Sequence, residues 1–117
     1  MTTMDNKLYM FGGHHMSDTN ASVVPTWKDV WSATASATTF TRVTSDALFS
    51  RSLANFVSLA HTLFVIGGTS NAWGNINFVP NFTPENTIYR SRDEGVTWAL
   101  HATAPWTARY FATAFIL

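Results

Sequence analysis

Residues 8–13 read LYMFGG, and residues 63–68 read LFVIGG. Each stretch has four apolar residues followed by two glycines, and the two stretches lie 55 positions apart in a chain of 117 residues. Self-similarity at a spacing of 20–50 residues or slightly more is typical of repeat architectures, in which one supersecondary unit recurs. The chain therefore contains the same unit twice.

Further matches along the chain support the repeat. Their offset is 58 positions instead of 55, because three residues are inserted within one loop. The aromatic spacing is also preserved, since Trp31 precedes Phe40 and Tyr89 precedes Trp98 by the same nine positions. We assign one repeat to residues 7–59 and the other to residues 62–117, within a single domain, 1–117. The matched pairs are Val30-Trp31 with Ile88-Tyr89, Thr39-Phe40 with Thr97-Trp98, and Arg51 with Arg109.

The composition predicts an all-β fold, because Thr and aromatic residues are abundant and strong helix formers are few. Aromatic residues make up 15% of the chain, and there are 17 threonines. Apolar-rich segments separated by short turns predict four strands in a unit: residues 51–59, 63–67, 87–92 and 97–101. We therefore expect each repeat to be a four-stranded antiparallel meander.

The apolar quartet before the glycine pair, followed by a spaced Tyr or Trp and then a Trp, resembles the kelch repeat. This resemblance covers nearly the whole chain and implies a β-propeller built from four-stranded blades. Propellers close with about four to eight blades, and this chain supplies two. Residues 109–117 (RYFATAFIL) align with the first-strand segment 51–59 (RSLANFVSL), and the N-terminal unit is expected to lack its innermost strand.

We therefore expect the terminal strand of one copy to complete a blade of the next copy in trans. Head-to-tail contacts of this kind close into a ring when the rotation per subunit divides a full turn. Three copies, giving a six-bladed homotrimer, are the favoured arrangement. Two copies with four blades and four copies with eight blades remain alternatives, as does a fragment or building unit of a larger propeller.

Residues 91–98 (SRDEGVTW) match the Asp-box pattern of sialidase-like propellers at Ser91, Asp93, Gly95, Thr97 and Trp98. That resemblance implies a hairpin between the third and fourth strands of a blade, away from any catalytic face. The corresponding segment of the other repeat, ATASATTF at residues 33–40, keeps only the Thr and the aromatic residue. We therefore interpret the motif as a structural turn.

Long loops on one face of a propeller are the expected place for ligand binding. Exposed Trp beside Asn and His suits a sugar ring, with its apolar face on the indole and its hydroxyls on the amides, although such tryptophans can instead pack under their own loops. Two arginines could bind an anion at the channel mouth, or could pair with backbone carbonyls or with Asp46. The candidates are His14, His15, Trp27, Trp73, Asn75, Asn77, Trp106, Arg51 and Arg109.

No metal or cofactor is expected, because the side chains of adjacent His14 and His15 point apart in an extended segment. The formal net charge is zero, which argues against nucleic-acid and membrane partners. A sialidase-like glycosidase is an alternative, but only Glu85 and Glu94 are available as glutamates, and a kelch-type copper-radical oxidase would need a cysteine. No secretory signal is visible, so the cytoplasm is the expected compartment. These features favour a non-catalytic module that binds a glycan or a protein.

Overall fold

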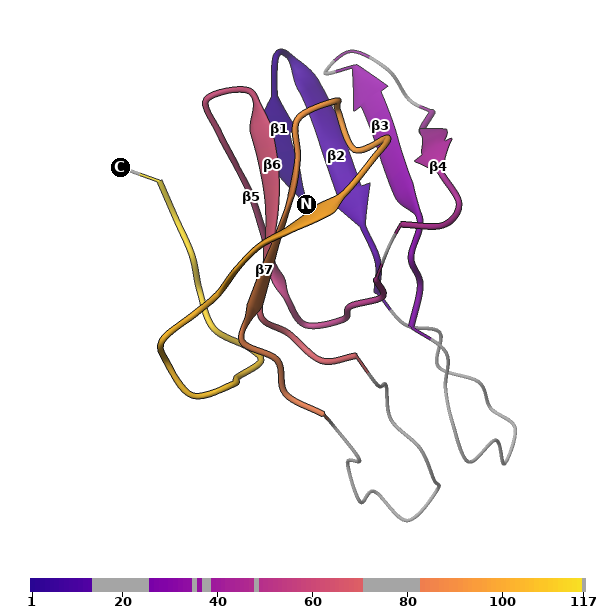
Figure 1. Cartoon of the computed structure of the whole chain (residues 1–117). Helices are drawn as coiled ribbons and strands as arrows, with labels where there is room; N and C mark the ends of the chain where they lie inside the picture. The colour runs from indigo at the N-terminus through magenta and orange to yellow at the C-terminus, as the bar shows by residue number, and fades with distance from the viewer. Residues whose placement is uncertain (14–25, 35, 37–38, 48, 71–82, 117) are drawn as a thin grey trace, which may run out of the picture.

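The computed structural model describes residues 1–13, 26–34, 36, 39–47, 49–70 and 83–116. Within them the chain forms two antiparallel sheets of four strands each, which confirms the all-β class (Figure 1). Sheet 1 contains β1 (Thr2–Met4), β2 (Lys7–Phe11), β3 (Val30–Thr34) and β4 (Thr41–Thr44) in that order. Sheet 2 contains β5 (Asn55–Leu59), β6 (Thr62–Ile66), β7 (Thr87–Ser91) and β8 (Ala99–Thr103), also in chain order. No helix in the described ranges is long and apolar enough to cross a membrane.

The first strand of sheet 1 corrects the expectation that the N-terminal unit lacks its innermost strand. Thr3 of β1 pairs with Leu8 of β2, just as Ser58 of β5 pairs with Leu63 of β6. Both hairpins turn through two residues with positive φ, Asp5-Asn6 in sheet 1 and Ala60-His61 in sheet 2. Such turns match the right-handed twist of the flanking strands and therefore favour a tight hairpin. Sheet 1 is thus completed by its own chain.

The segment 109–116 also differs from the expected strand. It has one isolated bridge, between Glu85 and Arg109, and no strand beyond it. The segment runs beside β5, where the amide of Ala114 donates to the Asn55 side chain at 2.8 Å. A strand needs a paired neighbour to satisfy its backbone groups, and no second strand of the described residues lies beyond this segment to supply that pairing.

The two halves of the chain also correspond in individual backbone hydrogen bonds. Gly13 N donates to Arg51 O at 3.1 Å, and Gly68 N donates to Arg109 O at 3.0 Å. The same correspondence relates Ala47 N, which donates to Lys28 O, to Ala104 N, which donates to Asn86 O. These pairs align Phe49 with Trp106, because each aromatic residue lies two positions after the matched alanine.

The core lies between the two sheets and draws its members from both. The fully buried Tyr9 of sheet 1 and Leu63 and Val65 of sheet 2 belong to it. Phe49, in the β4–β5 connection, stacks on Tyr89 with the ring centroids 3.7 Å apart and meets Trp98 edge-on at 5.6 Å. Aromatic pairs of this kind add about 0.5–1.5 kcal/mol beyond the area that they bury.

The connections lie at two ends of the molecule (Figure 1). The β1–β2, β5–β6 and β7–β8 turns lie at one end. The β4–β5 connection and the points where the chain leaves β2 and β6 lie at the other, which we call the loop end. The loop end is where the sequence placed its candidate binding residues.

Candidate functional site: two open sheet faces and the loop end

The turn between β7 and β8 is held by its own side chains. Ser91 Oγ donates to Asp93 Oδ1 at 2.8 Å and accepts a hydrogen bond from Gly95 N at 2.8 Å. Asp93 also accepts from the backbone amide and the hydroxyl of Thr97, and Trp98 Nε1 donates to Gly95 O at 3.0 Å. Burial raises the pKa of Asp93, but the hydrogen bonds from Thr97 and Ser91 outweigh it and leave that pKa lowered. The side chains of Ser91, Asp93 and Thr97 are therefore engaged within the turn itself.

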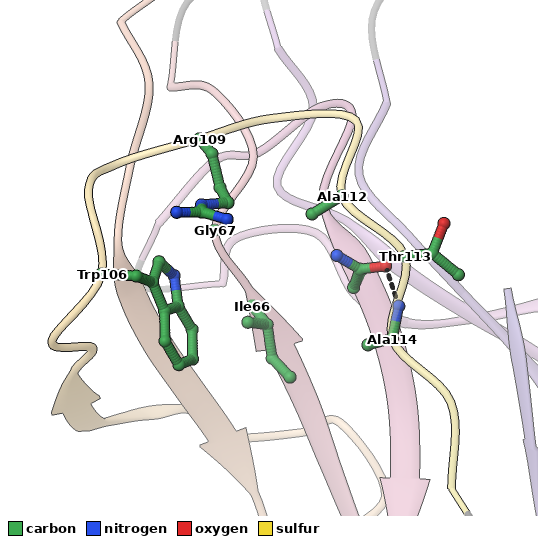
Figure 2. Close-up of a pocket in the computed structure, with 8 residues that line it drawn as sticks. Ile66, Gly67, Trp106, Arg109, Ala112, Thr113 and Ala114 are labelled. Carbon is green, nitrogen blue, oxygen red and sulfur yellow. Dashed lines mark hydrogen bonds between the residues drawn. The ribbon is translucent and has the colours of Figure 1, made fainter.

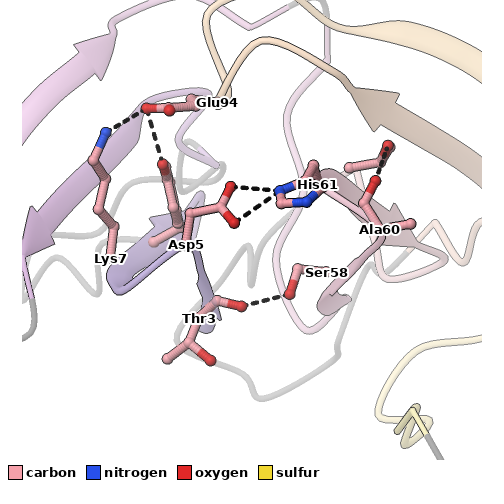
Figure 3. A network of polar contacts seen from close by, with 9 residues as sticks. Thr3, Asp5, Lys7, Ser58, Ala60, His61 and Glu94 are labelled. Carbon is pink, nitrogen blue, oxygen red and sulfur yellow. Dashed lines mark hydrogen bonds and ion pairs between the residues drawn. The ribbon is translucent and has the colours of Figure 1, made fainter.

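The same turn fixes sheet 2 onto sheet 1. The indole of Trp98 is 8% exposed and contacts Phe11, Phe49 and Phe56 across the core. At the tip of the turn, Glu94 accepts a hydrogen bond from Lys7 Nζ at 2.6 Å (Figure 3). The turn thus anchors the interface between the sheets through both an apolar and a polar contact.

The hydroxyl of Tyr9 also donates to the Glu94 carboxylate, at 3.2 Å. Burial, followed by the contact with Glu94, raises the pKa of Tyr9 to about 12. The hydrogen bonds from Lys7 and Tyr9 lower the pKa of Glu94. Glu94 is therefore an ionised structural carboxylate, not a proton donor held ready for chemistry.

A second polar contact joins the inner strands of the two sheets. The Ser58 hydroxyl donates to Thr3 O, and His61 Nδ1 lies 2.8 Å from Asp5 Oδ1 (Figure 3). The hydrogen bond and the charge of Asp5 raise the pKa of His61. The histidine side chain is 80% exposed, and exposed ion pairs contribute only a little to stability. This contact therefore joins the two sheets but adds only a little to the stability of the fold.

Arg51 is buried, with 6% of its surface exposed, and lies between the sheets. Its Nη1 donates to Ser50 O at 2.8 Å, which agrees with the predicted pairing to a backbone carbonyl. Its Nη2 donates to Thr87 Oγ1 at 2.8 Å and lies 3.5 Å from Glu85 Oε2. The other predicted partner, Asp46, pairs with Lys28 instead.

The guanidinium of Arg51 also lies over two aromatic rings, 5.5 Å from the centroid of Phe49 and 5.6 Å from that of Tyr89. A cation over an aromatic face is stabilised by the ring quadrupole. Arg51 therefore links the carbonyl of Ser50, in the β4–β5 connection, to the side chains of Thr87 and Glu85. It also packs on the stacked rings of Phe49 and Tyr89. Its role is to hold the interface.

Trp106 and Arg109, the counterparts of Phe49 and Arg51, lie on the outer side of sheet 2 (Figure 2). With Ile66 they line a pocket of about 230 Å³, which Asn55 and residues 112–114 bound on the other side. The Trp106 side chain is 39% exposed. Arg109 Nε donates to Thr107 O at 3.1 Å, and none of the carboxylates in the described ranges forms an ion pair with Arg109.

The open face of sheet 2 comprises Phe64, Ile66, Ile88 and Trp106. Tyr9 and Phe11 of β2 face the core, and their repeat counterparts in β6 are Phe64 and Ile66. Leu63 and Val65 of the same strand are buried against sheet 1, so strand alternation places Phe64 and Ile66 on the opposite face. Ile88 pairs with Ile66 and shares its side of the sheet.

The open face of sheet 1 comprises Leu8, Met10 and Trp31. Tyr9 is buried in the core, so its neighbours Leu8 and Met10 face away from sheet 2. Trp31 pairs directly with Met10 and lies on the same side. Asp29 Oδ2 accepts a hydrogen bond from Trp31 Nε1 at 2.6 Å, which holds a carboxylate beside the indole. Phe40, the counterpart of the buried Trp98, is 40% exposed.

The sequence candidates at the loop end are only partly described. Trp27 is 48% exposed, and its backbone amide donates to Gly13 O at 2.9 Å. No group of three or more His, Asp or Glu side chains in the described part of the chain could hold a metal ion. Five candidates lie outside the described residues: His14, His15, Trp73, Asn75 and Asn77.

That two blades leave two apolar faces without partners follows from the sequence, but most of the residues that form these faces were not identified from it, although the repeat aligns them. The main aromatic and aliphatic residues of the contact between the sheets, and Arg51, have counterparts 55 to 58 positions away that lie on the outer faces. Comparison of the chain with protein-family models and with curated proteins finds no match.

Proposed function

We propose that this chain is a non-catalytic binding module, built as two kelch-like blades of a β-propeller with an Asp-box turn in the second blade. Copies of the module associate head to tail, with three copies and six blades as the favoured ring, and a glycan or protein ligand binds at the loop end. The observation that carries the proposal is the interface between the sheets. The repeat counterparts of its aromatic and aliphatic side chains lie on the two outer faces, and the counterpart of Arg51 lies on one of them. No further sheet of the described residues covers these faces.

The engagement of the titratable side chains supports the non-catalytic part of the proposal. Both glutamates serve structural contacts, Glu85 with Arg51 and Glu94 with Lys7 and Tyr9. A glycosidase needs an acid and a second carboxylate or equivalent nucleophile flanking an open subsite. Glu94 lies at the opposite end of the molecule from the loops, in the β7–β8 turn.

The exposed indole of Trp27 supports ligand binding at the loop end. An exposed aromatic ring on a rigid scaffold offers a flat apolar platform to a sugar or to an apolar side chain of a protein. Because each copy in a ring would present the same loops, weak individual sites would act together and gain avidity.

A glycan array probed with the labelled chain tests the binding proposal, followed by titration of the best glycan. We expect Trp27→Ala to weaken binding by about fivefold or more, since loss of an aromatic platform removes about 1–3 kcal/mol. Val96→Ala is the matched control, because Val96 is equally exposed but lies in the β7–β8 turn at the other end. Binding that is lost in both variants, or in neither, would contradict a ligand site at the loop end. Turnover of a sialidase substrate would contradict the non-catalytic assignment.

A further inference from the structure

We propose that the open face of sheet 2 binds the open face of sheet 1 of a second copy of this chain. In this contact Trp106 packs on Trp31 and Phe40 of the second copy, and Arg109 forms an ion pair with its Asp29. The proposal rests on the head-to-tail association proposed above and specifies the contact that would produce it.

The interface within the chain provides the template for this contact. On its sheet 1 side lie Tyr9, Phe11, Phe49 and Arg51, and their repeat counterparts are Phe64, Ile66, Trp106 and Arg109. Those counterparts lie together on the outer side of sheet 2, three of them around the pocket of Figure 2. The outer side of sheet 2 thus carries three apolar side chains and an arginine at the positions that Tyr9, Phe11, Phe49 and Arg51 occupy on the inner side of sheet 1.

The complementary side also recurs. On the sheet 2 side of the interface lie Leu63, Val65, Tyr89 and Trp98, and their counterparts are Leu8, Met10, Trp31 and Phe40. Strand pairing preserves this correspondence, since Tyr89 pairs with Val65 and Trp31 pairs with Met10. The outer side of sheet 1 can therefore take the place that sheet 2 occupies within the chain.

Aromatic contacts would be reproduced in the assembled pair. Phe49 stacks on Tyr89 at 3.7 Å and meets Trp98 edge-on at 5.6 Å. By the repeat, Trp106 takes the position of Phe49 and meets Trp31 and Phe40 of the second copy. Trp106 and Trp31 are larger than Phe49 and Tyr89, whereas Phe40 is smaller than Trp98. Burying the three rings removes exposed aromatic surface from water.

Charge complementarity identifies a copy of the same chain as the occupant. Arg51 donates to Thr87, and the repeat places Asp29 where Thr87 stands, because Gly12 N bonds Asp29 O as Gly67 N bonds Thr87 O. Arg109 would therefore meet the Asp29 carboxylate where Arg51 meets the Thr87 hydroxyl, while the Glu85 carboxylate, which lies 3.5 Å from Arg51, aligns with Trp27. A charge-assisted hydrogen bond is stronger than one to a neutral hydroxyl, and only one oxygen of Asp29 accepts from Trp31.

Charge reversal tests the ion pair, with dissociation of the assembly measured by analytical ultracentrifugation. We expect Arg109→Glu and Asp29→Arg each to weaken association by about tenfold or more, because like charges then face each other. The double variant should recover most of the loss. Arg92→Glu is the matched control, since Arg92 is also exposed but lies in the β7–β8 turn. Circular dichroism of each variant checks that the sheets remain folded.

Cysteine cross-linking tests the geometry independently, and it is clean because the native chain has no cysteine. Arg109→Cys and Asp29→Cys are each treated with a short bismaleimide, separately and as a mixture. We expect cross-linked dimers only in the mixture, because unlike faces meet. Dimers from one variant alone would overturn the proposal in favour of like faces pairing.

The outcomes separate this contact from the broader proposal. An assembly that is insensitive to both charge reversals and gives no cross-link in the mixture would overturn this contact while leaving head-to-tail association standing. A folded monomer at every concentration would overturn both, and would leave the open faces to partners of a different chemistry.

Discussion

Replacing Gly95 by Ala should test whether the β7–β8 turn backs directly onto sheet 1. Gly95 has a φ of +93°, and a Cβ added there would lie 2.8 Å from Val30 Cγ1. The backbone conformation alone should cost about 1–3 kcal/mol in a non-glycine residue. Val30 is fully buried and cannot move aside, so overpacking should add about 1–3 kcal/mol. The expected loss in the free energy of unfolding is therefore about 2–6 kcal/mol.

Gly13→Ala provides the matched control for the backbone cost. Gly13 has a φ of +108°, and nothing lies within 4 Å of an added Cβ. Urea denaturation of both variants at one protein concentration, followed by tryptophan fluorescence, would measure the difference, because association makes stability depend on concentration. We expect Gly95→Ala to be the more destabilising by about 1–3 kcal/mol. Equal losses would refute the contact between the turn and Val30.

Three further substitutions test the interface and its titratable groups. Trp98→Ala should lower the free energy of unfolding by about 3–5 kcal/mol in urea denaturation, and a loss below about 1 kcal/mol would contradict its place in the core. Asp93→Asn should make the free energy of unfolding depend less on pH in the acid range. The pKa of Asp93 in the folded protein is lowered from 3.8, so the ionised carboxylate stabilises the fold above pH 3.8. That stabilisation is lost as the pH falls through the folded-state pKa. Wild type should lose stability between about pH 10 and about pH 12, because the pKa of Tyr9 is raised from 10.0 to about 12 in the folded protein. Tyr9→Phe has no phenol to ionise and should not show this loss. Thermal unfolding across pH, with wild type as reference, checks both, and unchanged profiles would contradict them.

The repeat made most of the fold predictable from sequence, because the same pattern of apolar residues, glycines and aromatic residues occurs in both copies. The predicted strands 63–67 and 87–92 lie close to β6 (Thr62–Ile66) and β7 (Thr87–Ser91), whereas the predicted strand 51–59 begins four residues before β5 (Asn55–Leu59). The last strand was placed two residues early, at 97–101 instead of Ala99–Thr103. Thr97 and Trp98 are used by the turn, where Asp93 and Gly95 bind them, and the strand starts only after them.

The terminal segments were harder to predict because they are short and their pairing is decided by tertiary structure. β1 has only three residues, too few for a hydrophobic period, although the offset of 55 between Leu8 and Leu63 also aligns Thr3 with Ser58. For residues 109–116 the alignment indicated a strand. Whether this segment forms a strand depends on a neighbouring strand with which it can pair, and the sequence pattern does not show whether such a neighbour is present.

The candidate site was predicted only in outline. Residue type and repeat position identified Arg51, Arg109 and Trp106 as candidate binding residues. They did not reveal that Arg51 is buried while Arg109 and Trp106 line a pocket on the outer side of sheet 2. That difference arises because Arg51 and Phe49 have sheet 2 packed against them, while no sheet in the described part of the chain packs against their counterparts. Sequence reasoning ranked residues by chemistry, whereas their roles depend on which face of a blade is covered.

The solution mass of the intact chain, measured by light scattering during size exclusion, tests the central claim that its two outer faces bind each other. The account predicts a single species near three times the chain mass of 13.0 kDa, stable on dilution to low micromolar concentration. A well-folded species of 13.0 kDa at every concentration would contradict it.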